Sequence, residues 1–474
     1  ASIGVHTAFQ DSSPMVLLVG HVRREDIGRE AFQEVDFEQM FAPLAKAVRM
    51  IESPEHAAAD VAWAFDAATS GRPGPVVLVM PEDVLRERVE ACVPAPIPEA
   101  EAHMDEGELE RIHHRLCQAQ RPVLMVGGSR WTDQARADIL QFAENMDLPV
   151  CCSMRRLDII DNTHSNFIGE VGIAPNPNLL ARIKDADLLL VVGARLGEMT
   201  SQGYTLLSPE DAAHKLVHVH VDEAELGKVF TPAIGVACSP EGFAKAAKDL
   251  SPVTDHWAGW RAQARADYTA WRRPQAVAGP LDLAAAMGEL DGLLDDDVIV
   301  SVDAGNFTGW AQRYLSFGGK RKFIGPTNGA MGFGVPGGVA AKTAYPDRQV
   351  VVFVGDGGFG MTGQEISTAV QQNQNLLILL FNNGIYGTIR MHQERNHPER
   401  VLATDLANPD YAALARAAGA YGDTIETTAQ FKPAVESALA SGKVAVLDVR
   451  VDPNIISTST TLDAIRQKAL ASQQ

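Results

Sequence analysis

The sequence predicts an α/β protein with three doubly wound parallel-sheet domains. Short apolar, β-branched runs alternate with alanine-rich helical stretches along the chain, which is typical of parallel sheets covered by helices on both faces. A length of 474 residues corresponds to roughly three domains of about 150 residues each. Two stretches of linker character, at 92–98 and less distinctly at 251–280, separate three blocks. We therefore expect domains at 1–91, 105–250 and 281–474.

The apolar runs are the expected strands, taken here in chain order. In the first block they are 15–19 and 76–80, with a helix at 54–70 between them. In the second block they are 123–126, 149–152, 188–192 and 216–221. In the third block they are 298–302, 350–354, 376–381 and 444–449, with a helix at about 363–372. Ligands of such sheets bind beyond the carboxyl ends of the strands, so we expect functional residues just after these runs.

The composition excludes several classes of function. Lys and Arg number 41 against 60 Asp and Glu, a net charge of -19, which disfavours a nucleic-acid or anionic-membrane partner. The longest apolar runs, such as 376–381, are too short to cross a bilayer. The five cysteines form no CxxC pair, so neither a disulfide scaffold nor a zinc site is indicated. A cytoplasmic location fits these features best.

A glycine-rich motif follows the predicted strand at 350–354. Gly355, Gly357 and Gly360 satisfy the GxGxxG pattern of dinucleotide-binding proteins, which would indicate an NAD- or FAD-dependent oxidoreductase. Asp356, however, lies inside the turn, where it would repel a bare pyrophosphate. The next strand also ends in two asparagines rather than in the acidic residue that would hold a ribose hydroxyl. The oxidoreductase interpretation is therefore the weaker alternative.

A metal ion removes both objections. Asp356 and Asn383 each follow a parallel strand, and one βαβ crossover joins them, so their side-chain oxygens can converge at one sheet edge. Carboxylate, amide and phosphate oxygens form the shell that Mg²⁺ prefers. Gly357 and Gly358 allow backbone amides to approach the same phosphates. The pattern therefore predicts a Mg²⁺-diphosphate site.

A GDG followed after 24 residues by NN resembles the signature of thiamine diphosphate-dependent enzymes. The likeness extends along the chain. The segments AFQE at 31–34, SGRPGP at 70–75 and PED at 81–83 resemble the pyrimidine-binding domain of the acetolactate synthase group. The second block resembles the central Rossmann-like domain of that family, and the third its thiamine diphosphate-binding domain. The resemblance implies thiamine diphosphate and Mg²⁺ as cofactors.

The resemblance also implies a role for particular residues. Asp356, Asn383 and the backbone carbonyl of Ile385 would be the Mg²⁺ ligands. Met331 would support the bent conformation of the cofactor. The remaining residues implied at the site are Gln33, Asn306, Phe307, Gly357 and Gly358 for the cofactor, and Phe32, Thr388 and His392 for the substrate.

The implied activity is cleavage or formation of a C–C bond on a 2-keto acid or a related acyl donor, as a lyase or transferase. Synthases of branched-chain amino-acid biosynthesis typically carry Lys, Met and Trp where this sequence has Glu82, Thr388 and His392. These differences argue against strict acetolactate synthesis, and with it against the FAD that such enzymes bind.

Two further expectations concern completeness and assembly. The family's activating glutamate and its SGPG-like turn are expected upstream of Ala1, so the sequence resembles a fragment of a longer polypeptide with an incomplete first domain. A genuinely truncated start would instead favour a non-catalytic cofactor-binding paralogue. The family binds its cofactor between two subunits, which implies a homodimer or homotetramer.

Overall fold

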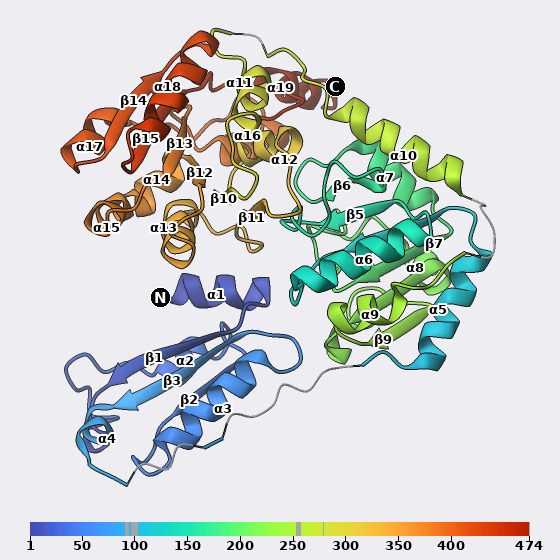
Figure 1. The fold of residues 1–474 in the computed structure, drawn as a ribbon. Coiled ribbons are helices and arrows are strands. Elements are labelled where there is room, and N and C mark those ends of the chain that lie inside the picture. The colour runs from blue at the N-terminus through green and yellow to red at the C-terminus, as the bar shows by residue number, and fades with distance from the viewer. Residues whose placement is uncertain (91–93, 96–102, 253–256, 278, 474) are drawn as a thin grey trace.

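A computed structural model describes residues 1–90, 94–95, 103–252, 257–277 and 279–473. It contains three parallel sheets with helices packed on them, shown one after another along the chain in Figure 1. The predicted α/β class with three parallel-sheet units is confirmed. The proline-rich stretch at 92–98 lies almost entirely outside the described residues.

The first sheet has three strands in the order β1-β3-β2: β1 (Met15–His21), β3 (Pro75–Pro81) and β2 (Ala47–Met50). Val77 and Val79 of β3 pack against Val5 and Phe41, which belong to α1 and α2 on one face. Alanines of α3 pack on the other face. The helices of this unit are α1 (Ser2–Asp11), α2 (Phe37–Phe41), α3 (Ala57–Thr69) and α4 (Glu82–Arg86), with the 3-10 turn η1 (Arg24–Asp26).

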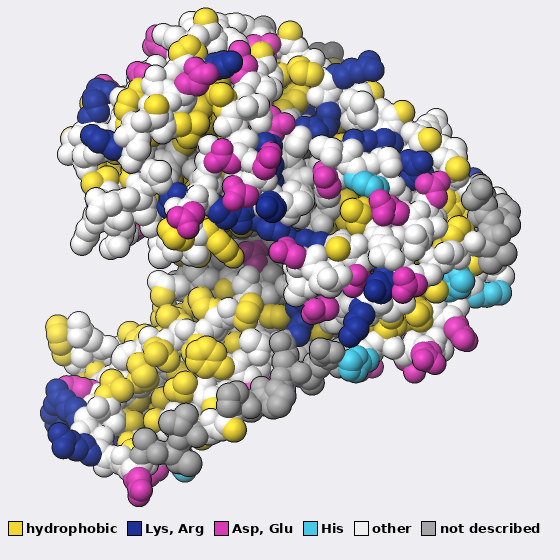
Figure 2. Space-filling view, in the orientation of Figure 1, with side chains coloured by type: hydrophobic (Ala, Val, Ile, Leu, Met, Phe, Trp, Pro, Cys, Tyr) yellow, Lys and Arg dark blue, Asp and Glu magenta, His cyan; other side chains and the backbone are white. Residues whose placement is uncertain are grey.

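This first unit leaves apolar side chains at the surface. Leu18 on the edge strand β1 is 52% exposed, and Phe65 on α3 is 60% exposed. Figure 2 shows hydrophobic side chains gathered over this part of the molecule. Contiguous apolar surface of this kind is typical of a face that another protein surface covers.

The middle sheet has six strands in the order β6-β5-β4-β7-β8-β9. The strands are β4 (Pro122–Val126), β5 (Val150–Ser153), β6 (Phe167–Val171), β7 (Leu188–Val192), β8 (Leu216–His220) and β9 (Ile234–Ala237). The helices are α5 (Glu106–Gln118), α6 (Asp133–Asn145), α7 (Pro177–Asp185), α8 (Pro209–Lys215), α9 (Pro240–Ala247) and α10 (Ala258–Trp271), with η2 (Glu223–Glu225). The central strands are buried on both faces, as their continuous apolar sequences require.

The third sheet also has six strands, in the order β11-β10-β12-β13-β15-β14. The strands are β10 (Ile299–Val302), β11 (Lys322–Ile324), β12 (Val350–Gly355), β13 (Leu377–Asn382), β14 (Tyr421–Ile425) and β15 (Ala445–Arg450). The helices are α11 (Leu283–Asp291), α12 (Thr308–Tyr314), α13 (Gly334–Ala344), α14 (Asp356–Thr362), α15 (Ile366–Gln371), α16 (Gly387–Asn396), α17 (Tyr411–Ala417), α18 (Thr428–Ala440) and α19 (Leu462–Ala471), with η3 (Gly363–Glu365).

The helix expected at about 363–372 is present as η3 and α15. The separate helix α14 was not expected from the sequence, and its first residue is Asp356. The glycines after it are therefore helical rather than part of an open turn. A short 3-10 segment, η3, then separates α14 from α15. Among the described residues, no helix combines the length and apolarity needed to cross a membrane.

A half-buried carboxylate joins the middle and third units. Glu170 lies on β6, where its Oε1 atom accepts a hydrogen bond from the backbone N–H of Arg155 at 2.6 Å. Its Oε2 atom accepts from Nε2 of Gln312 on α12 at 2.9 Å. Burial raises the pKa of Glu170 from its ordinary 4.5 to about 7, and the hydrogen bond from the Arg155 backbone opposes this shift.

Glu170 should make folding stability depend on pH. Because its folded-state pKa is raised, its stabilising contribution is complete below pH 4.5 and is lost as pH rises through 7. In the wild type the free energy of unfolding should fall by about 3 kcal/mol between pH 4.5 and pH 7 because of this group. Glu170→Gln has no titrating carboxyl at this position, so this fall should be absent from its profile. Within the described chain the Oε1 atom of Gln312 has no partner, so it can accept from the new amide. Denaturant titrations at several pH values, with exposed Glu436→Gln as control, measure this; parallel profiles for wild type and Glu170→Gln would contradict it.

Candidate cofactor site

The carboxyl ends of β12 and β13 bring Asp356 and Asn383 to the same edge of the third sheet. The two strands are parallel neighbours, and Gly355, one residue before Asp356, pairs with Phe381, two residues before Asn383. Asp356 follows β12 directly, and Asn383 follows β13 directly. The turn after β13 approaches Asp356 closely, since the Gly384 N–H donates to its Oδ2 atom at 2.8 Å. The sheet topology therefore produces the convergence that the strand order implied.

The carboxylate of Asp356 is held from three sides. Its Oδ1 atom accepts from the Gly357 N–H at 2.9 Å, and Oδ2 accepts from Nδ2 of Asn408 at 2.7 Å as well as from Gly384. The residue is only 3% exposed. Burial raises the pKa of Asp356, and the hydrogen bond from Asn408 opposes this shift. A nearby cation would favour the charged form further.

The two asparagines at the end of β13, Asn382 within the strand and Asn383 after it, have different hydrogen-bond partners. Asn382 points into the domain, where its Nδ2 atom donates to Asp448 at 2.9 Å and its Oδ1 atom accepts from Asn408 at 2.9 Å. Asn408 in turn accepts from the Tyr411 hydroxyl at 3.1 Å. Asn408 thus connects Asp356 to the sheet, and the sequence analysis missed it. It lies in a loop outside any recognisable motif, so only the tertiary structure identifies it.

Asn383 and Ile385 lie on a tight turn at this edge. The Oδ1 atom of Asn383 accepts from the Ile385 N–H at 3.2 Å, and Gly384 between them has a φ of +67°, which glycine adopts without strain. Ile385 pairs with Asp405 in an isolated bridge and packs against Ile456 and Leu462. The turn is therefore fixed from both sides.

The chemistry of this donor set fits a hard cation. Each carboxylate oxygen offers about two lone-pair sites, so Oδ1 of Asp356 can accept from Gly357 and still face an ion. In the described part of the chain, no three His, Cys, Asp or Glu side chains group around a possible metal site. An ion here would therefore combine one carboxylate with amide, backbone and ligand oxygens, which suits Mg²⁺ bound to a diphosphate.

Two glycines at the start of α14, Gly357 and Gly358, leave no room for side chains. A Cβ on Gly357 would lie 2.7 Å from a ring carbon of Tyr386 and 3.3 Å from the Met331 methyl group. A Cβ on Gly358 would lie 2.7 Å from Oδ2 of Asp303. The backbone at the start of α14 is therefore in close contact with the segments that carry Met331 and Asp303.

Asp303 is a second buried carboxylate that organises the site. Its oxygens accept from the N–H groups of Ala304 at 2.6 Å, Gly332 at 2.9 Å and Gly334 at 3.3 Å. It is fully buried, which raises the pKa of its carboxyl, while the hydrogen bond from Ala304 opposes the shift. Through Gly332 and Gly334 it holds the loop on which Met331 is placed. Asn306 and Phe307, which follow in the same segment, were expected at the site from the sequence, but this role of Asp303 was not.

Met331 is 36% exposed beside Gly357 and is thus available to a ligand. It also lines a cleft of about 1430 Å³ between the three units. That cleft reaches the cofactor site only at its margin, because its lining includes Met331 and Thr362 but neither Asp356 nor Asn383. The buried Asp356 carboxylate therefore lies outside the lining of this cleft.

Two of the other expected residues are in direct contact. The Thr388 hydroxyl donates to Oδ1 of Asn306 at 3.1 Å, so α16 lies against the turn after β10. Phe307, by contrast, stacks on Phe381 with ring centroids 5.5 Å apart. Its ring therefore packs against the core of the domain. His392 is exposed on α16, one helical turn after Thr388.

Phe32 and Gln33 lie apart from these residues. Phe32 is 88% exposed on the first unit, so its ring faces solvent. Gln33, also exposed, has a left-handed φ of +69°. Glu34 stabilises this loop by accepting from the N–H groups of Gly28 and Ala31. Within one chain the structure thus collects the expected residues of the third unit but not those of the first.

Comparisons with known proteins match two parts of the chain to the domains of one enzyme family. Residues 303–449 match the family model of the thiamine pyrophosphate enzyme C-terminal TPP binding domain, and residues 109–247 match the central domain of the same enzymes. The chain is 30% identical over 455 residues to the acetolactate synthase isozyme 2 large subunit of Escherichia coli K12, covering 95% of this chain and 81% of that protein.

Two other relatives give the same result. The acetolactate synthase large subunit of Parasynechococcus marenigrum is 30% identical over 465 residues, covering 94% of this chain and 74% of that protein. That of Haemophilus influenzae is 28% identical over 476 residues, covering 95% and 81%. The fold and the matched domains define a thiamine diphosphate-dependent enzyme of the lyase or transferase type. Within that class, the chain belongs to the acetolactate synthase-like family, and the oxidoreductase alternative is not favoured.

Proposed function

We propose that this protein uses thiamine diphosphate and Mg²⁺ to cleave or form a C–C bond on a 2-keto acid or a related acyl donor. The observation that carries the proposal is the convergence of Asp356 and Asn383 at the ends of two neighbouring strands. Thiamine diphosphate, when bound, supplies a nucleophilic carbon and accepts the electron pair released as the substrate bond breaks. The protein contributes binding, orientation and electrostatics.

In this proposal each residue of the third unit has a separate task. Asp356, Asn383 and the carbonyl oxygen of Ile385 would hold the Mg²⁺ ion, and with it the diphosphate. The backbones of Gly357, Gly358, Asn306 and Phe307 would line the diphosphate. Met331 would fill the space beneath the bound cofactor and fix its bent shape.

Thr388 and His392 would contact the substrate. They lie on one side of α16 because they are one helical turn apart. Thr388 is oriented by its hydrogen bond to Asn306. A hydroxyl and an imidazole can both bind the carboxylate or carbonyl oxygen of a 2-keto acid. Because these polar groups replace the apolar residues typical of acetolactate synthases, we expect a different preferred acyl donor.

We also propose that the site is completed by a second subunit. Phe32 is 88% exposed on the first unit and Gln33 is exposed beside it, so both are free to contact a second subunit. The apolar surface around Leu18 and Phe65 provides a face that another subunit can cover. A homodimer or homotetramer would bring Phe32 and Gln33 of one subunit to the cofactor of the other.

Calorimetric titration with thiamine diphosphate tests the proposal. With Mg²⁺ present we expect saturable binding, and with excess EDTA we expect it to be lost, because the diphosphate would face Asp356 without a neutralising cation. Release of CO₂ from a panel of 2-keto acids would then identify the substrate. Titration with NAD(H) is the control. Metal-independent NAD(H) binding without thiamine diphosphate binding would contradict the proposal.

A further inference from the structure

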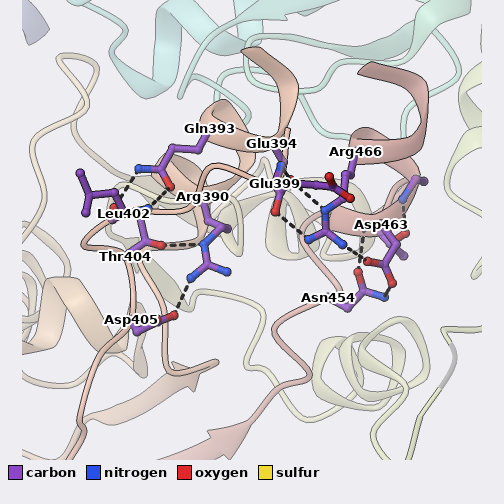
Figure 3. Close-up of polar contacts among 12 residues, drawn as sticks. Arg390, Gln393, Glu394, Glu399, Leu402, Thr404, Asp405, Asn454, Asp463 and Arg466 are labelled. Carbon is purple, nitrogen blue, oxygen red and sulfur yellow. Dashed lines mark hydrogen bonds and ion pairs between the residues drawn. The ribbon is translucent and has the colours of Figure 1, made fainter. Parts of the chain in front are cut away.

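The C-terminal helix α19 packs directly against α16, the helix that carries Thr388 and His392 (Figure 3). The centre of the contact is an ion pair in which Arg466 donates to both carboxylate oxygens of Glu394. Nε lies 2.9 Å from Oε2, and Nη2 lies 2.6 Å from Oε1. Such a bidentate arrangement fixes both the distance and the relative orientation of the two helices.

Glu394 lies on the side of α16 opposite to the substrate candidates. Two positions along an α-helix correspond to a rotation of about 200°. Glu394 comes two positions after His392, and Arg390 comes two positions after Thr388, so both lie on the side away from the substrate candidates. One side of α16 therefore presents Thr388 and His392, and the other side is attached to the rest of the domain. A change on the Glu394 side of α16 would rotate or shift the helix and so displace Thr388 and His392.

The Glu394 carboxylate depends on its partner. Its side chain has no exposed surface, whereas that of Arg466 is 28% exposed. Besides Arg466, it accepts from the N–H of Glu399 at 3.1 Å. The Arg466 guanidinium holds the pKa of Glu394 below its usual range, so the carboxylate stays charged. A buried charge without its partner is costly, so removing Arg466 would force α16 to move until water reaches Glu394.

Other contacts bind the same helix and the turn before it. Ile385 packs with Ile456 and Leu462, the first residue of α19, so the C-terminal segment also supports the candidate metal turn. Arg390 donates to the Thr404 hydroxyl at 2.6 Å, and Gln393 donates to the Leu402 carbonyl at 2.8 Å. The segment 402–405 thus holds one flank of α16, and α19 holds the other.

We propose that Glu394 and Arg466 are positioning residues that set the placement of α16, and through it the geometry with which Thr388 and His392 meet the substrate. Neither residue contacts the candidate cofactor atoms, so they act through the helix. This inference rests on the proposed function for the role of Thr388 and His392. The placement of α16 by α19 itself does not depend on it.

Arg466→Met, Arg466→Lys and Glu394→Gln test this assignment, with the exposed pair Lys432 and Glu436 on α18 as a matched control. Hydrogen exchange in the cofactor-free protein reports on the backbone amides of residues 387–396. We expect Arg466→Met to speed their exchange by about tenfold or more. Arg466→Lys should have a smaller effect, because lysine keeps the positive charge but cannot form the bidentate hydrogen bonds of the guanidinium. Lys432→Met and Glu436→Gln should leave these amides unchanged.

Steady-state kinetics provide the second measurement. Arg466→Met should raise KM for the 2-keto acid about tenfold while kcat changes by less than about threefold. The reason is that the change displaces the substrate-binding residues of α16 and leaves the residues that bind the cofactor in place. In the double variant Arg466→Met/Glu394→Gln, the loss of substrate-binding free energy derived from KM should be smaller than the sum of the losses in the two single variants. If Arg466→Met does not fold, Arg466→Lys and Glu394→Gln carry the test.

Normal exchange at 387–396 and unchanged KM, together with a lowered thermal midpoint, would overturn the proposal in favour of a purely stabilising pair. Failure of the wild-type protein to bind thiamine diphosphate would overturn the proposed function instead. In that case faster exchange at 387–396 in Arg466→Met would still support the placement of α16 by α19.

Discussion

Replacing Asp356 with alanine should abolish Mg²⁺-dependent binding of thiamine diphosphate. The residue supplies the carboxylate of the candidate site, and it is held there by Asn408, Gly357 and Gly384. Residues that merely support a metal ligand typically change affinity by about 10–100-fold, so loss of the ligand itself should exceed that range. Calorimetric titration with the cofactor at saturating Mg²⁺ measures the effect.

The matched control is Asp423→Ala, which removes an exposed carboxylate from edge strand β14 of the same sheet. It should bind the cofactor like the wild type. The far-ultraviolet circular dichroism of both variants should match that of the wild type, which separates loss of binding from loss of fold. Wild-type affinity in a folded Asp356→Ala protein would remove Asp356 from the site.

Asp303→Asn should destabilise the loop that carries Met331. Both oxygens of Asp303 accept backbone N–H groups, so an amide in its place would direct N–H donors against the donors of Ala304, Gly332 or Gly334. Leaving one such buried donor unpaired costs about 1–3 kcal/mol, and we expect the free energy of unfolding to fall by this amount. Denaturant titration at neutral pH measures it.

Cofactor affinity should fall as well, because Met331 and Gly358 both adjoin the Asp303 segment. Asp296→Asn, at an exposed position before β10, is the matched control and should change neither quantity. An Asp303→Asn protein with wild-type stability would show that the loop tolerates the amide, and that the role given to Asp303 is wrong.

All the strands expected from the sequence are present in the structure, within one or two residues. The five that were missed are β2, β6, β9, β11 and β14, and each lies at the edge of its sheet. Edge strands here are short or carry charged residues and glycines, as in the KFI of β11 and the YGDTI of β14. An edge strand has one neighbour and more solvent contact, so its sequence lacks the continuous apolar run of a buried strand.

The candidate site was predictable where it depended on strand order. Asp356 and Asn383 follow two apolar runs joined by one crossover, and parallel strands bring such residues together regardless of the details of packing. The hydrogen bond of Asn408 to Asp356, and those that Asp303 accepts from the Met331 loop, were not predictable. Their partners are backbone amides or side chains far away in the sequence, and no local pattern marks such contacts.

The amino-acid sequence by itself determined the α/β class, the buried strands and the two polar residues at the ends of β12 and β13. These follow from local hydrophobic patterning and from the geometry of parallel sheets. Only the tertiary structure decided how Asp356 is anchored, that the Phe307 ring packs inward, and that Arg466 holds Glu394 behind α16. Those features depend on contacts between distant segments, which form only when packing brings them together and excludes water from between them.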